Sequence, residues 1–146
     1  MPTGYYVRRR KANDFKKEEY FNKLSVEWLD YVAYRDSVNI VHAHNHGEQR
    51  IGRYPVDGFD SANQTIYEFY GCYFHGHRCE ANQNEFNDKC GVPVSVIYEQ
   101  TIQRKKYLEE RGYKVIDIWE CEYISMRKTD KDLKVFSAEL HSRFRH

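Results

Sequence analysis

Acidic, thiol and imidazole side chains gather between positions 66 and 79, where the chain reads I-Y-E-F-Y-G-C-Y-F-H-G-H-R-C. These side chains belong to Glu68, Cys72, His75, His77 and Cys79. The segment begins with the alternating apolar residues of a buried strand and then passes into residue types that suit metal coordination better than packing. We therefore expect the chemistry of this protein to lie here.

The thiols and imidazoles have the spacing of a structural zinc site. Cys72, His77 and Cys79 form a C-x4-H-x-C pattern within one short loop. Tetrahedral Zn²⁺ needs a fourth nitrogen or sulfur ligand, and Cys121, at the end of a predicted buried strand, can supply it. Because bound zinc would hold this loop, its removal should impair folding and function together.

Other ligand sets are open at this stage. Cys90 is a rival to Cys121, and His75 could replace His77. The four cysteines of the chain could also be ordinary reduced thiols, since two disulfides would not be expected in a reducing compartment.

Two acids are predicted to meet beside this segment. Asp57 ends a predicted strand from 53 to 56, and Glu68 lies on a predicted strand from 65 to 70. We expect these strands to form an antiparallel hairpin, with Gly58 and residues 60 to 64 in its polar turn. The hairpin would bring the two carboxylates near one another.

Clustered carboxylates favour a catalytic Mg²⁺ or Mn²⁺ that activates water for phosphodiester hydrolysis. Asp57 and Glu68 would bridge the metal, with the Phe69 main-chain carbonyl as a further ligand and Glu48 as a candidate acid from an upstream element. His75 would orient or deprotonate the water, because its reference pKa is near neutral. The structural alternative is a turn aspartate and an edge-strand acid.

The elements that must position these residues follow an α/β pattern. Helices are predicted from about 14 to 24, from an N-cap at Ser25 to about 35, from about 96 to 111, and after a cap at Thr129. A near-continuous apolar strand from 113 to 121 follows the third helix, and residues 80 to 93 are predicted to be a surface loop. The order α, α, β, β, loop, α, β, α predicts one compact domain with helices around a mixed sheet.

Three histidines precede the acidic segment. His42, His44 and His46 alternate at strand spacing, which would place them on one face at an exposed edge or a metal site. The simpler interpretation is a polar strand face that ends in a loop at Gly47.

Charge is evenly mixed along the 146 residues, with a formal net charge of +1, so no global basic field predicts a nucleic-acid partner. Local contacts to DNA phosphates are expected from Arg104 and Lys105, and from Arg8 to Lys11 in a flexible basic arm over residues 1 to 13. The alternative is a solvated tail and helix face. Without a signal-like N-terminus or an apolar span, we expect a soluble, intracellular protein with no membrane partner.

Three separated motifs carry a resemblance to known nucleases: V-D-G-F at 56 to 59, Y-E-F-Y-G-C-Y-F-H-G at 67 to 76, and W-E-C at 119 to 121. With these motifs the chain resembles the very short patch repair endonucleases of the PD-(D/E)XK superfamily. It is still more similar to the nuclease-like modules of protein-primed family B DNA polymerases from self-synthesising transposons and linear plasmids. The resemblance covers residues 48 to 121 and implies a three-layer restriction-endonuclease-like fold, with a central mixed β-sheet flanked by helices.

The resemblance also implies roles for individual residues. Asp57 matches the metal-binding aspartate and His75 the catalytic histidine. The structural zinc ligands fall on Cys72, His77, Cys79 and Cys121. Tyr73 and Phe74 fall on two rings that wedge into the base stack.

Two departures bear on activity. Tyr70 stands where the repair enzymes have a histidine and the wider superfamily a lysine, whereas Glu68 restores the acid of the wider superfamily. We therefore expect a monomeric, Mg²⁺-dependent DNA endonuclease that nicks its substrate. The alternative is a catalytically inactive, zinc-stabilised DNA-binding module of a larger polymerase or transposon protein.

Overall fold

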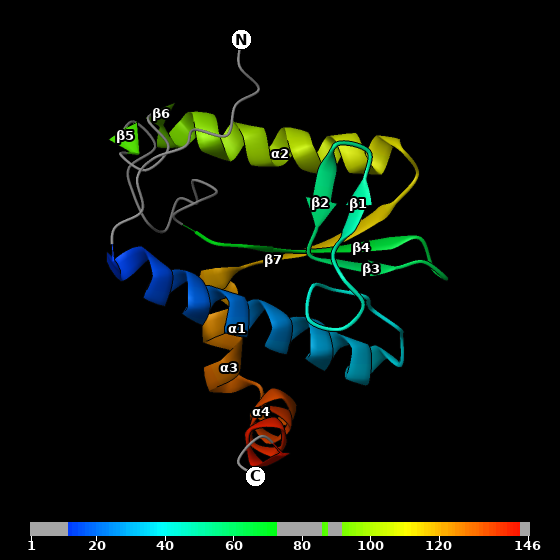
Figure 1. Cartoon of the computed structure of the whole chain (residues 1–146), viewed down its shortest axis with the longest axis vertical. Helices are drawn as coiled ribbons and strands as arrows, with labels where there is room; N and C mark the ends of the chain where they lie inside the picture. The colour runs from blue at the N-terminus through cyan, green and yellow to red at the C-terminus, as the bar shows by residue number, and fades with distance from the viewer. Residues whose placement is uncertain (1–11, 73–85, 88–91, 144–146) are drawn as a thin grey trace.

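A three-stranded mixed sheet forms the middle layer of the protein, in a computed structural model that describes residues 12–72, 86–87 and 92–143. Strand β4 (Thr65–Tyr70) lies between β3 (Gly58–Asp60), to which it is antiparallel, and β7 (Lys114–Trp119), to which it is parallel. Helix α2 (Val94–Glu110) covers one face of the sheet (Figure 1). The other face is covered by α1 (Ala12–Asp36) and α3 (Glu120–Thr129), and α4 (Lys131–Arg143) packs against these two helices on the side away from the sheet. The predicted α/β class with a mixed sheet between helices is confirmed, and it is compatible with the predicted three-layer fold.

Two short strand pairs lie outside this sheet. Strands β1 (Gln49–Ile51) and β2 (Tyr54–Val56) form an antiparallel hairpin that rises beside the C-terminal half of α2 (Figure 1). The two-residue strands β5 (Phe86–Asn87) and β6 (Val92–Pro93) pair just before α2. The predicted loop from 80 to 93 therefore contains short strands, and its other residues lie outside the described part of the chain.

Strand β4 is buried along its whole length and contributes to both cores. Tyr67 and Phe69 pack with Trp28 of α1, with ring centroids 6.1 and 6.0 Å from the indole. Ile66, on the opposite face, packs with Leu108 of α2. Because successive side chains of a strand point to opposite faces, Glu68 and Tyr70 share the α2 side with Ile66.

The predicted break between two N-terminal helices is wrong. Ser25 lies buried within the single helix α1 and does not cap a new one. The apolar stripe continues across it through Leu24, Trp28 and Val32, and residues 12 to 36 contain no Gly or Pro. Residues 1 to 11, most of the predicted basic arm, lie outside the described residues.

The predicted pairing of residues 53 to 56 with β4 is also wrong. Strand β2 pairs with β1 instead, and β3, which was expected in the turn, pairs with β4. The polar turn is confined to residues 61–64. Gly58 pairs with Tyr67, so the register still brings Asp57, one residue earlier, opposite Glu68.

The sequence pattern after β7 concealed a helix. Strand β7 ends at Trp119, and Glu120 and Cys121 begin α3 instead of ending a strand. Thr129 ends α3 and does not cap the last helix. At the start of α4, Asp130 Oδ1 accepts a hydrogen bond from the Leu133 N–H at 3.0 Å. The apolar run had hidden this boundary because buried strands and buried helix turns have similar composition.

The three histidines do not form a strand. Residues 43–46 form a turn, in which His44 and His46 are exposed. His42 is 3% exposed; its Nε2 lies 2.9 Å from Asp30 Oδ1, and its Nδ1 accepts the His44 N–H. His42 therefore anchors this turn to α1.

Gly58 marks a close approach between the sheet and α1. A Cβ at this position would lie 2.7 Å from Leu29 Cδ2 and 2.8 Å from Ile40 Cγ2. We expect Gly58→Ala to lower the free energy of unfolding by about 1–3 kcal/mol, as overpacking does, in urea denaturation. The added substitution Leu29→Val should recover part of this loss, whereas simple additivity of the two losses would contradict the clash.

None of the helices within the described residues is long and apolar enough to cross a membrane.

Candidate active site

Asp57 and Glu68 meet on the α2 side of the sheet. Asp57 occupies the bend between β2 and β3, where its Oδ2 accepts the Phe69 N–H at 2.8 Å. This bond fixes the Asp57 carboxylate beside β4. Glu68 is only 2% exposed, and its carboxyl group is hydrogen-bonded to that of Asp57. The predicted proximity of the two acids is thus present in the structure.

Arg104 is the counterion of this acidic pair. Its Nη2 and Nε lie 2.8 and 3.2 Å from Glu68 Oε1, and Nη2 also donates to the Pro55 carbonyl. The side chains of Arg104 and Glu68 are 18% and 3% exposed, so their contact is shielded from water. Arg104 therefore ties α2 to β4 and to the strand that leads to Asp57.

Burial controls the protonation of the pair. It raises the pKa of Glu68 to about 8, with the nearby Asp57 charge acting in the same direction and Arg104 opposing both. Burial also raises the pKa of Asp57, against the stabilising bond from the Phe69 N–H. At neutral pH the Glu68 carboxyl accordingly keeps a proton and donates it in the bond to Asp57, since two adjacent carboxylates resist full ionisation.

This protonation predicts that the metal-free protein loses stability as the pH rises. The folded chain retains a Glu68 proton that the unfolded chain releases at its ordinary pKa, near 4.5, so raising the pH from about 4.5 to about 8 favours unfolding. Each pKa unit is worth about 1.4 kcal/mol, and we expect a loss above that amount between pH 5 and pH 8.5. Urea denaturation in EDTA at both pH values measures it.

Glu68→Gln is the matched control for this pH dependence. Its amide cannot titrate, yet it can accept a bond from Arg104 and donate one to Asp57. The variant should therefore have a smaller loss of stability between the two pH values. Equal losses in the variant and the parent protein would show that Glu68 does not retain the proton.

The chemistry of these donors fits a divalent cation. A cation between the two carboxylates would replace the shared proton, and carboxylate and main-chain oxygens are ligands that Mg²⁺ accepts. Within the described residues, no three His, Cys, Asp or Glu side chains come together as a metal-holding group. Glu48 is exposed and, since Gln49 pairs with Val56, it lies at the same end of the β1–β2 hairpin as Asp57. Asp57, Glu68 and the Phe69 carbonyl are thus the protein ligands on which a cation would depend, together with water or a substrate oxygen.

A second polar group, next to the pair, escaped the sequence reasoning. Asp117 of β7 is the register partner of Glu68 on the neighbouring parallel strand. Lys105 Nζ lies 3.2 Å from its carboxylate, and the Tyr70 hydroxyl is hydrogen-bonded to it. The signal was available, because Asp117 is the one acid within V-I-D-I-W, an otherwise apolar run.

Tyr70 is held as a neutral phenol at the end of β4. Burial raises its pKa, and the charges of Glu68 and Asp117 add to the effect. Its ring packs 4.9 Å from that of Trp119, which stacks in turn on Tyr98 of α2. Tyr70 therefore supplies a hydroxyl and an aromatic wall, but no positive charge, to this end of the sheet.

Two of the predicted zinc ligands come together at the carboxyl end of the sheet. Cys72 Sγ accepts the Cys121 N–H at 3.3 Å, and the Cys72 N–H donates to Glu120 Oε1 at 3.3 Å. Cys72 is buried and Cys121 is half-buried. Cys72 follows β4 and Cys121 lies in the first turn of α3, so the contact between the Cys121 main chain and Cys72 Sγ brings two residues of the type that binds zinc to one place.

Several predicted site residues lie outside the described part of the chain. They are the zinc ligands His77 and Cys79, the rival ligand Cys90, the catalytic histidine His75, and the wedge residues Tyr73 and Phe74. Of the predicted DNA contacts, Arg104 and Lys105 face the sheet and are paired with Glu68 and Asp117.

Similarity to a known protein falls on part of the chain. A Type II nicking enzyme, V.NmeAIP of Neisseria meningitidis serogroup A / serotype 4A, is 31% identical over 68 residues, which cover 42% of this chain and 46% of the relative. The match thus spans about half the length of this curated relative. No family model and no solved structure matches the chain.

Proposed function

We propose that this protein is a metal-dependent DNA endonuclease that cuts one strand of its substrate. The observation that carries the proposal is the contact between the Asp57 and Glu68 carboxyls, on adjacent elements at one end of a mixed sheet. The partial similarity to a nicking enzyme supports a nuclease, and the motifs shared with the very short patch repair endonucleases support this branch of the PD-(D/E)XK superfamily.

A divalent cation such as Mg²⁺ or Mn²⁺, held by Asp57, Glu68 and the Phe69 carbonyl, would supply an activated water and charge stabilisation on the scissile phosphate. The Phe69 N–H bond keeps the Asp57 carboxylate oriented. Arg104 holds Glu68 in place and partly offsets the cost of its burial. We include His75 as the residue that orients or deprotonates the water, and Glu48 as a further acid at the same end of the hairpin.

Zinc in this proposal has a structural role. Cys72 and Cys121 would hold it together with His77 and Cys79, and thereby fix the segment that carries His75 to the end of β4 and the start of α3. The same segment would place the rings of Tyr73 and Phe74 for stacking on DNA bases.

A second candidate function is a zinc-stabilised DNA-binding module without turnover. Tyr70 favours it, because a neutral phenol cannot provide the charge that lysine gives to the wider superfamily. Lys105 is a cation on the same face of the sheet, one strand across from Glu68, but it is paired with Asp117. Conversion of supercoiled plasmid to open circles in Mg²⁺ distinguishes the two functions, since a module without turnover binds DNA and leaves it intact.

A further inference from the structure

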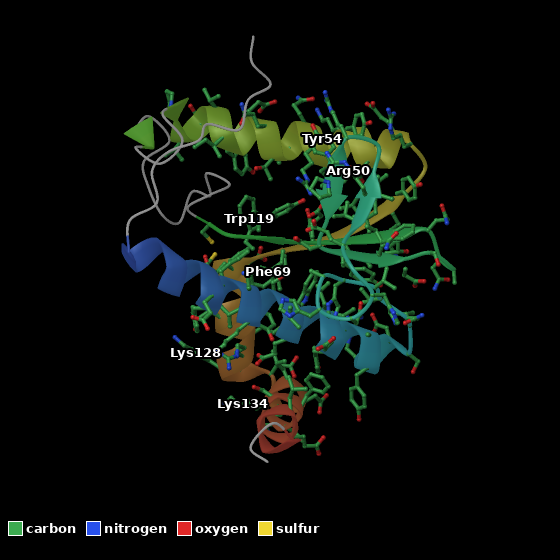
Figure 2. The ribbon with its side chains drawn as sticks, viewed as in Figure 1. Arg50, Tyr54, Phe69, Trp119, Lys128 and Lys134 are labelled. Carbon is green, nitrogen blue, oxygen red and sulfur yellow. The ribbon has the colours of Figure 1, made fainter. Side chains whose placement is uncertain are left out.

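Arginine and tyrosine side chains form a continuous surface on the β1–β2 hairpin and the end of α2. We call it the arginine–tyrosine patch, and its members are Arg50, Arg53, Tyr54, Tyr107 and Arg111. The Tyr54 and Tyr107 rings pack edge to face with centroids 5.1 Å apart, so they join the hairpin to the helix. Figure 2 shows Arg50 and Tyr54 on the hairpin, beside α2.

The guanidinium groups of Arg53 and Arg111 are held against these rings. Arg53 lies 5.1 Å from the centroid of Tyr54 and 5.0 Å from that of Tyr107, and Arg111 lies 3.9 Å from the centroid of Tyr107. Arg50 donates to the Arg53 carbonyl at 3.1 Å across the turn. A guanidinium near a ring keeps N–H donors available at its edge, and these match the oxygens of a phosphate.

The patch carries an excess of positive charge. Arg50, Arg53 and Arg111 are exposed, and among the described residues none of them is ion-paired with a carboxylate. Glu109 and Glu110, in the last turn of α2, are the neighbouring acids. Since residues three or four apart share a helix face, Tyr107 lies with Glu110 and Arg111, whereas Glu109 points away from them. The three arginines of the patch therefore outnumber the one acid on this face of the helix end.

Arg104 connects the patch to the candidate active site. Its guanidinium lies 4.9 Å from the centroid of the Tyr54 ring and pairs with Glu68 at 2.8 Å. One side chain thus contacts both the aromatic base of the patch and the buried acidic pair. A polyanion bound along the patch would run directly to the carboxylates.

We infer that the arginine–tyrosine patch binds the phosphate backbone of duplex DNA next to the scissile bond. This inference rests on the proposed function and adds to it a binding surface formed by Arg50, Arg53 and Arg111. The positive charge of the patch is complementary to phosphate groups, and the patch continues through Arg104 to the acidic pair. Both features favour a polymer of phosphates as its ligand. Stacked guanidinium groups on a rigid hairpin and helix suit the fixed phosphate spacing of a duplex, because little side-chain freedom is lost on binding.

The test is DNA binding without cleavage. Affinity for a fluorescent duplex is measured in EDTA, as a function of salt, for the parent protein and for the triple variant Arg50→Gln, Arg53→Gln and Arg111→Gln. Each lost phosphate contact lowers the slope of log K against log salt by about 0.9, so we expect a slope smaller by roughly 2–3 and binding roughly 30-fold weaker or more at low salt.

The matched control removes three exposed lysines from the opposite side of the sheet. Lys128, Lys131 and Lys134 belong to α3 and α4, and Figure 2 shows Lys128 and Lys134 on the face away from α2. Their replacement by Gln changes the net charge equally and should leave the salt slope unchanged. If the triple arginine variant does not fold, the single variants Arg53→Gln and Arg111→Gln should each lower the slope by about 0.9.

The outcomes separate this inference from the proposed function. A lower slope in the arginine variant alone supports the patch, even if the parent protein never cuts DNA. Equal slopes for the parent and both triple variants would overturn it, even if the parent protein nicks plasmid. Absence of duplex binding, or binding to single-stranded DNA or RNA in preference to the duplex, would overturn it as well.

Discussion

Asp57→Asn should reduce the nicking of supercoiled plasmid by at least about a hundredfold, since about 3 kcal/mol of transition-state stabilisation corresponds to that factor. The asparagine keeps an oxygen that can accept the Phe69 N–H, so the bend between β2 and β3 should persist. It removes one of the two carboxylates on which a divalent cation would depend. Initial rates of open-circle formation in Mg²⁺ and in Mn²⁺ measure the change.

Asp36→Asn is the matched control for this prediction. Asp36 ends α1, is exposed and pairs only with the adjacent Arg35 among the described residues. Its replacement should leave nicking unchanged. If Asp57→Asn nicks plasmid as fast as the parent protein, Asp57 is not part of the active site. If neither protein nicks plasmid in Mg²⁺ or in Mn²⁺, yet both bind DNA, the result favours the DNA-binding module without turnover.

A thermal scan separates metal binding from turnover. If Asp57 holds the cation, Mg²⁺ should raise the Tm of the parent protein and not that of Asp57→Asn, because a ligand stabilises only a protein that binds it. This readout does not depend on the choice of DNA substrate.

The proximity of Asp57 and Glu68 was predictable because the short connection between them forces the chain to turn back, whichever residues before the turn pair with β4. The sequence pattern paired the wrong strand with β4, yet both the predicted and the observed hairpin bring the two acids to adjacent elements. The turn residues after Gly58 were read as irregular since they are polar. Phe59 and Asp60 form β3 with Gly58 instead, because Gly58 allows close packing against Leu29 and Ile40.

The role of Arg104 could not be predicted from the sequence alone. Its position on a helix with neighbouring lysines was typical of a solvent-exposed basic face, which favoured a phosphate contact. The helix instead turns Arg104 toward β4, where the negative charge shared by Asp57 and Glu68 requires a partner. The arginine–tyrosine patch was missed for a related reason, since its residues come from two segments about fifty positions apart and meet only when α2 packs beside the hairpin.

The zinc site should determine the stability of the carboxyl end of the sheet. We expect purified protein to carry about one equivalent of zinc, and Cys121→Ser to lose it, because the Cys121 N–H bond to Cys72 Sγ already brings these two residues together. Zinc binding free energy contributes directly to folding, so a loss of about 3–5 kcal/mol is expected, or roughly 10 °C in Tm for a domain of this size. Elemental analysis and thermal scans measure the two quantities.

Two comparisons isolate zinc from the side effects of substitution. Chelator-treated parent protein should unfold at the same temperature as Cys121→Ser, since both lack the metal, and the chelator should not lower the Tm of the variant further. If Cys121 is the fourth ligand, the variant Cys90→Ser should retain zinc. If instead Cys90→Ser loses zinc and Cys121→Ser keeps it, Cys90 is the fourth ligand. Less than about half an equivalent of zinc in the parent protein would contradict the four-ligand site, and Cys72 and Cys121 would then stabilise the end of β4 by their hydrogen bond alone.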